Sequence, residues 1–102
     1  MSEHAVFWRD SSTPHEIWAG SIRVGPDNVL LRGGNGHSSI AHNLGPAQVA
    51  AAERAAPEER IANYRSLRLR LQNGRTLIIA SIAGAGVLTE ILDALAALTV
   101  SI

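Results

Sequence analysis

The fold is decided by residues 66–82, which read SLRLRLQNGRTLIIASI. Residues 66–71 alternate polar and apolar side chains without interruption, which is the period of a strand with one buried face. Asn73-Gly74 follows and favours a tight hairpin turn, because both central residues of a type I′ turn need positive φ. Residues 76–82 are rich in β-branched side chains and supply the second strand.

A two-residue loop sets the register of this predicted hairpin. It places Arg70 opposite Leu77 and Arg68 opposite Ile79. These four residues lie on one face of the hairpin. The opposite face then carries Leu67, Leu69, Leu71, Ile78, Ala80 and Ile82. The arginine-bearing face mixes guanidinium groups with aliphatic side chains. Either the arginine stems cover those aliphatic groups, or a partner or a second layer does.

Residues 87–98 predict a closing amphipathic helix that packs on the sheet. Its apolar stripe consists of Leu88, Ile91, Leu92 and Leu95. Earlier in the chain, strand-like patterns occur at residues 5–8, 17–24, 29–32 and 39–44. Pairing Val24 with Val29 puts Ile22 and Leu31 on one face. The opposite face then carries Arg23, Leu30 and Arg32.

Residues 46–56, which read PAQVAAAERAA, fit two different structures. Helix propensity is high, because alanine dominates and Pro46 suits a first helical turn. Such a helix would bury little apolar area, however, and a strand at this place would complete a meander. The sequence leaves both alternatives open.

Composition predicts one domain over residues 1–102, since 46% of the residues are hydrophobic and the formal net charge is zero. Bulk electrostatics gives no reason to expect nucleic acid or an anionic membrane as a partner. All nine basic residues are arginine and there is no cysteine, so disulfides and thiolate zinc sites are excluded. No apolar run is long enough to span a membrane. Residues 1–4 do not begin a signal peptide, so the expected location is the cytoplasm.

The order of the predicted elements resembles the pleckstrin-homology-like (PH-like) domain, in particular small bacterial PH-like domains. The resemblance is carried by the hairpin of residues 20–32, by residues 40–49, and by the hairpin of residues 67–79 before the helix. It implies a mainly β / α+β fold, an antiparallel PH-like β-barrel or curved sheets of about seven strands closed by one C-terminal α-helix. It also implies a scaffold that binds phosphoinositide head groups, peptides or proteins. Phosphoinositide binders carry Lys and Arg in and beside the loop between their first two strands, whereas residues 10–16 and 25–28 contain neither.

The sequence offers no catalytic, cofactor or metal site. The histidines His4, His15, His37 and His42 lack metal-ligand spacing, and His42 lies between two aliphatic residues, as an interior histidine does. No serine has a paired histidine and acid at a recognisable spacing. We therefore expect a non-enzyme without a cofactor.

The function predicted from the sequence is a non-enzymatic binding or assembly module. It would bind a protein partner or another copy of itself, as a homo-oligomer. The alternative is an anionic lipid head group or a small phosphorylated ligand, bound by the same arginines. The candidate face consists of Arg23, Arg32, Arg68, Arg70, Arg75, Leu77 and Ile79.

Overall fold

A computed structural model of the chain describes residues 2–13, 15–82 and 85–100. Its strands are β1 (Ser2–Asp10), β2 (Trp18–Val24), β3 (Val29–Gly34), β4 (Ser39–Leu44), β5 (Val49–Arg54), β6 (Ser66–Leu71) and β7 (Thr76–Ser81). The helix α1 (Ala85–Val100) follows them, and the short 3-10 turns η1 (Pro46–Gln48) and η2 (Pro57–Glu59) flank β5. The prediction of about seven strands and one C-terminal helix is confirmed.

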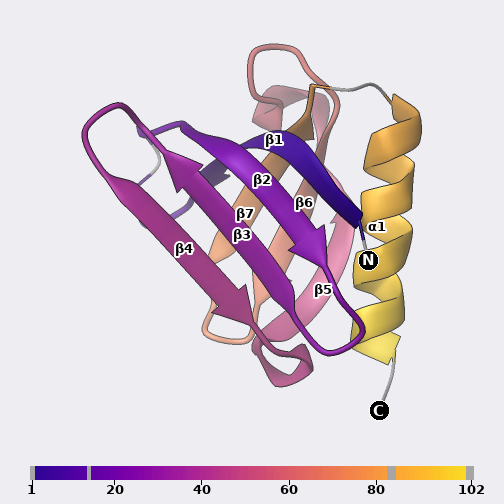
Figure 1. Cartoon of the computed structure of the whole chain (residues 1–102). Helices are drawn as coiled ribbons and strands as arrows, with labels where there is room; N and C mark the ends of the chain where they lie inside the picture. Colours follow the sequence, from indigo (N-terminus) through magenta and orange to yellow (C-terminus); the bar gives the residue numbers. More distant parts are fainter. Residues whose placement is uncertain (1, 14, 83–84, 101–102) are drawn as a thin grey trace.

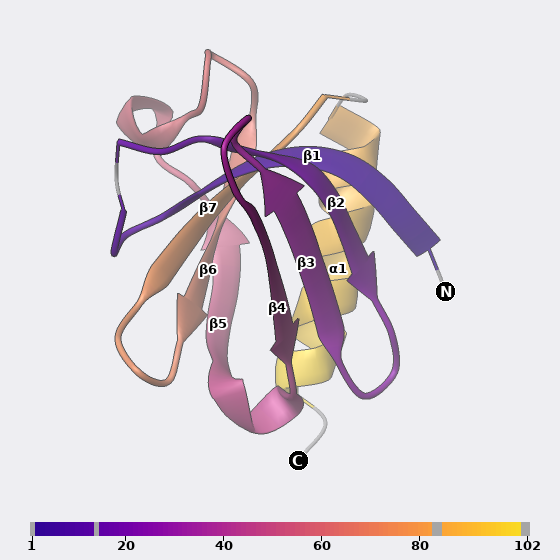
Figure 2. The same ribbon diagram turned by 60° about the vertical axis from the view of Figure 1, so that its left-hand side comes forward.

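The strands form one antiparallel sheet in the order β4-β3-β2-β1-β7-β6-β5. It consists of two meanders, β1 to β4 and β5 to β7, which are joined where β1 pairs with β7. The sheet curls into a half-barrel, and α1 lies against its inner face, chiefly on β5 (Figures 1 and 2). We call the side that faces away from α1 the outer face.

The core lies between the inner face and α1. Trp8 and Trp18 are both buried in this core and stack with ring centroids 5.5 Å apart. The predicted β2–β3 register is confirmed, since Val24 pairs with Val29 and the inward residues Ile22 and Leu31 are fully buried. The helix contributes its predicted stripe, of which the buried members are Leu88, Ile91 and Leu95, together with Leu98. Within residues 2–13, 15–82 and 85–100, no helix combines the length and hydropathy needed to cross a membrane.

The register of the β6–β7 hairpin differs by one residue from the predicted register. Arg70 pairs with Thr76, because the loop contains three residues and ends at Gly74, which has φ +90°. The N–H of Leu71 donates to the carbonyl of Arg75 (2.9 Å) and closes this loop. A three-residue hairpin loop with glycine at positive φ is a common alternative to the two-residue turn.

A one-residue shift moves every side chain of a strand to the opposite face. Leu77 and Ile79 are therefore fully buried in the core, and the prediction that they share a face with Arg68 and Arg70 is wrong. Their place on the outer face is taken by Ile78, which pairs with Arg68, and by Ala80, which pairs with Ser66.

Residues 49–54 form strand β5 rather than a helix, which decides between the two alternatives that the sequence left open. Val49 is buried and Ala52 packs against the core. Because α1 lies chiefly on β5, the short alanine side chains allow the helix to approach the strand closely.

Candidate functional site

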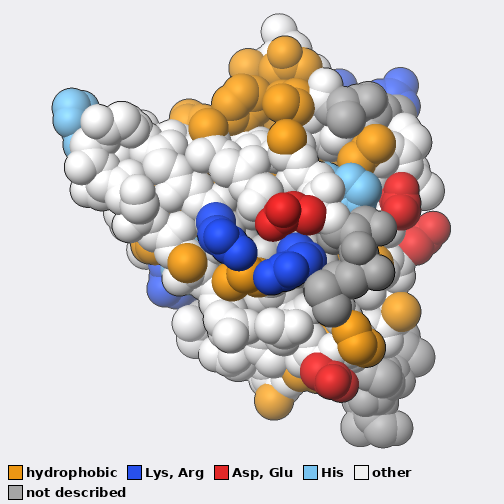
Figure 3. All heavy atoms as spheres, viewed as in Figure 1, with side chains coloured by type: hydrophobic (Ala, Val, Ile, Leu, Met, Phe, Trp, Pro, Cys, Tyr) orange, Lys and Arg blue, Asp and Glu red, His pale blue; other side chains and the backbone are white. Residues whose placement is uncertain are grey.

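The structure brings together only some of the arginines predicted to form one face. Arg68 and Arg70 lie side by side on the outer face of β6. Arg23 on β2 and Arg32 on β3 face outward too, but β1 and β7 separate β2 from β6, which places them roughly 14 Å or more away. In Figure 3, basic side chains lie with an acidic one over β2 and β3. Arg75 turns to a buried carboxylate instead.

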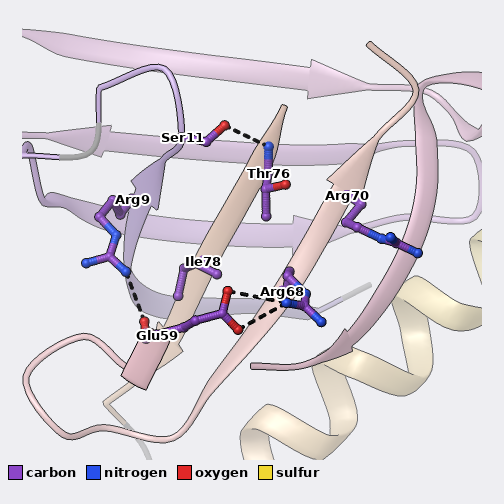
Figure 4. A pocket seen from close by; sticks show the side chains of 7 residues that line it. All are labelled: Arg9, Ser11, Glu59, Arg68, Arg70, Thr76 and Ile78. Atoms are coloured by element: carbon purple, nitrogen blue, oxygen red, sulfur yellow. Dashed lines mark hydrogen bonds and ion pairs between the residues drawn. The ribbon is translucent and has the colours of Figure 1, made fainter. Parts of the chain in front are cut away.

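A hollow of about 530 Å³ lies on the outer face over β1, β7 and β6. We call it the arginine hollow. It is lined by Arg9, Ser11, Glu59, Arg68, Arg70, Thr76 and Ile78 (Figure 4).

The sheet register builds the centre of this hollow. Ile78 on β7 pairs with Arg9 on β1 and with Arg68 on β6, so the three residues form one row across three strands. With strands about 4.8 Å apart, the two arginine backbones lie about 10 Å apart. Ile78 is buried at 6% exposure and forms an apolar floor between two guanidinium groups.

Two carboxylates contact the arginines of the hollow. Both oxygens of Glu59 accept hydrogen bonds from Nη1 of Arg68, at 3.2 and 3.3 Å. Oε1 of Glu53 lies 3.2 Å from Nη2 of Arg68 and 3.4 Å from Nε of Arg70. The neighbouring carboxylates of Glu53 and Glu59 raise the pKa of Arg68 above its ordinary value.

The arginines of the hollow differ in how far the protein itself satisfies them. The side chain of Arg70 is 57% exposed, against 32% for Arg68. Arg9 donates from Nη2 to the backbone carbonyl of Glu59 (3.0 Å). These three arginines outnumber Glu53 and Glu59 by one charge. Because guanidinium groups present several donors in a fixed plane, this arrangement is suited to bind a carboxylate or a phosphate.

A second polar cluster lies at the end of β1. Asp10 is 3% exposed and forms an ion pair with Arg75. The N–H of Ser12 also donates to Oδ1 of Asp10 (2.9 Å). Burial raises the pKa of Asp10, but the bonds from Arg75 and Ser12 lower it by more, so its pKa lies below the ordinary 3.8. The carboxylate is therefore ionised at neutral pH.

His42 lies beside this ion pair. Its Nε2 is 4.0 Å from Oδ2 of Asp10, beyond hydrogen-bond distance, and has no hydrogen-bond partner within the described residues. Its ring contacts that of Trp8 edge-on, with centroids 5.4 Å apart. Burial and the positive charge of Arg75 lower the pKa of His42 below 6.5, so the imidazole is neutral at pH 7. The Asp10–Arg75 pair is best explained as structural, since each charge neutralises the other.

Within the described part of the chain, no group of three or more His, Asp or Glu residues is arranged to hold a metal ion. No protein-family model matches the sequence, and no curated protein shows significant similarity to it. The inference of function therefore depends on the geometry of the arginine hollow.

Of the seven residues that line the hollow, only Arg68 and Arg70 were predicted as site residues, and the two charged residues among the other five are Arg9 and Glu59. Arg9 belongs to it only because β1 pairs with β7, and no local pattern indicates that pairing. Glu59 follows Pro57-Glu58, a combination typical of a solvated turn. The detectable signal for Arg9 is its alternation with Trp8, which points it away from the core.

Proposed function

We propose that this chain is a non-enzymatic binding module that takes an acidic segment of a partner protein into the arginine hollow. The observation that carries the proposal is the cross-strand row Arg9–Ile78–Arg68 with the exposed Arg70 beside it. The row offers guanidinium groups on both sides of an apolar floor. An acidic side chain next to an aliphatic one is complementary to such a surface.

Two further features support a binding module. Seven antiparallel strands followed by one helix agree with the PH-like resemblance, and we propose that the chain is a PH-like scaffold. The hollow also contains hydroxyl groups from Ser11 and Thr76 at its edge, beside a floor without titratable groups. Such a surface can hold a ligand, and the Glu59 carboxylate in its lining is paired with Arg68 rather than with a hydroxyl group.

The test measures binding of a fluorescein-labelled polyglutamate peptide by fluorescence anisotropy at low ionic strength. The wild-type protein is compared with Arg70→Ala and with Arg32→Ala. Both variants lose one exposed arginine of the outer face, but only Arg70 lines the hollow. We expect Arg70→Ala to weaken binding about tenfold, the effect of losing one charge-assisted contact. Arg32→Ala should change it little. A polyglutamine peptide should not bind.

Other results would contradict the proposal or favour a different ligand. Equal losses in both variants would indicate attraction by net charge alone, and no binding by wild type would exclude the proposal. Binding of an inositol phosphate without binding of the peptide would favour the small phosphorylated ligand. Light scattering of the protein alone at micromolar concentration tests self-association, and a monomer would leave a separate protein as the partner.

A further inference from the structure

The connection between β5 and β6 lies over the outer face beside the arginine hollow. Ile61 is 5% exposed and packs with Ile78 and Ala80. The N–H of Ala55 donates to the carbonyl of Ser66 (3.0 Å). These contacts hold the backbone of the connection against the sheet. As a result, the turn η2 lies at the rim of the hollow.

The last residue of that turn, Glu59, directs its side chain into the hollow. Figure 4 shows Arg9 and Arg68 reaching Glu59 from two sides. Arg68 binds the carboxylate, whereas Arg9 binds the backbone carbonyl. Oε1 of Glu59 also accepts the N–H of Ala56 (2.9 Å). An acidic side chain from the same protein thus already uses the guanidinium group that an acidic partner segment would use.

We infer that Glu59 is an internal occupant of the arginine hollow, and that an acidic partner segment binds by replacing its carboxylate at Arg68. This inference rests on the proposed function and adds a regulatory step to it. The partner must compete with Glu59, so affinity depends on how firmly the turn η2 holds that side chain.

The exchange requires little rearrangement. The side chain of Glu59 is 27% exposed and that of Arg68 is 32% exposed, and an ion pair that remains in contact with water is weak. Because Ile61 and Ala55 anchor the connection on either side, only the Glu59 side chain has to rotate. Its carboxylate then enters solvent while the backbone of the turn stays in place.

The test compares Glu59→Gln with Glu58→Gln in the polyglutamate assay. Both variants remove one negative charge from the same turn. Glu58 is exposed and forms no ion pair with any described residue. Glutamine at position 59 keeps an oxygen that can accept the Ala56 N–H, so η2 is preserved. We expect Glu59→Gln to bind the peptide about threefold more tightly than wild type, and Glu58→Gln to bind like wild type.

A second measurement follows the wild-type protein directly. The Ala56 amide should shift in ¹H–¹⁵N NMR spectra when the peptide is added, because a Glu59 carboxylate that leaves Arg68 also gives up that N–H. The Gly45 amide is the internal control, since it donates to Oε1 of Gln48 (2.8 Å) in the equivalent turn η1. It should not shift.

The outcomes separate this inference from the proposed function. Wild-type binding that Glu59→Gln leaves unchanged or weakens, with an unshifted Ala56 amide, would overturn the inference and leave the proposed function intact. Binding by Glu59→Gln alone would support the inference in its strongest form. No binding by any of the three proteins would overturn both.

Discussion

His42 occupies a position that makes stability depend on pH. Its pKa is lowered below 6.5 by burial and by the charge of Arg75. In the unfolded chain the His42 imidazole therefore takes up a proton near pH 6.5, whereas in the folded chain it does so only at lower pH. The free energy of unfolding consequently decreases as pH falls below 6.5. Asp10 adds a second loss at lower pH, since its lowered pKa stabilises the folded chain above 3.8 and less below it.

Urea unfolding at a series of pH values tests this prediction. His42→Leu should flatten the decrease just below pH 6.5, because leucine does not titrate and still packs against Trp8. His37→Gln is the matched control, since His37 is exposed in the loop between β3 and β4. If His42→Leu kept the wild-type slope in this range, another group would be responsible for it.

Ala62 has φ +50°, a left-handed conformation that disfavours a Cβ atom. Glycine adopts this conformation without steric cost, so Ala62→Gly should raise the free energy of unfolding by about 1 kcal/mol. The control is Ala56→Gly, at φ −66°, where glycine only adds freedom to the unfolded chain and should lower stability. Equal effects in a urea titration would show that the backbone at Ala62 carries no strain.

At the scale of the elements, the β6–β7 hairpin shows how far local patterns determine structure. Both strands were predicted correctly, because alternation and β-branched content are local properties. The register between β6 and β7 was predicted wrongly, because Gln72-Asn73-Gly74 fits a loop of two residues or of three residues. Residues 77–80 are all apolar, so hydrophobicity could not show which of them faces the core. In the structure both sides are covered, one by α1 and the other by the connection after β5.

The β5 segment shows a different limit of local patterns. Its alanines favour a helix by propensity, but they form a strand because β6 offers a pairing edge and α1 covers the inner side. Both of these elements follow β5 in the chain. A property that depends on later elements cannot be predicted from residues 46–56 alone.

Gly33 allows β3 to pass against the stacked tryptophans. A Cβ atom there would lie 2.7 Å from Nε1 of Trp8 and 2.9 Å from Cβ of Trp18. Gly33→Ala should therefore lower the free energy of unfolding by about 2 kcal/mol, as overpacking of a core does, and should change the tryptophan emission. Gly34→Ala is the control, because its nearest contact is an ordinary 3.5 Å to the carbonyl of Ser38. Similar stabilities for the two variants would contradict the close packing.

At the scale of the whole molecule, the candidate site exists because distant segments pair. β1 and β7 lie at opposite ends of the sequence, yet their register aligns Arg9 with Ile78. Strand patterns predicted both elements but contain no information about which strands become neighbours. The sequence thus identified Arg68 and Arg70 as candidates, and only the topology adds Arg9 and separates Arg23 from them.

The same β1–β7 junction predicts that the two meanders unfold together. Leu95 on α1 is fully buried, so Leu95→Ala should lower the free energy of unfolding by about 3 kcal/mol. Trp8 and Trp18 lie in the other meander, on β1 and β2. If unfolding is cooperative, their fluorescence and the far-UV circular dichroism should shift to the same lower urea midpoint.

Leu92→Ala is the control, since Leu92 lies on the same helix but is only partly buried. This substitution should lower the free energy of unfolding by less than Leu95→Ala does. A fluorescence midpoint that stayed at the wild-type value while the dichroism midpoint fell would show that β1 to β4 unfold independently of α1. In that case the pairing of β1 with β7 would not couple the two halves of the arginine hollow. Arg9 and Arg68 would then be held in register only as long as both meanders happened to be folded.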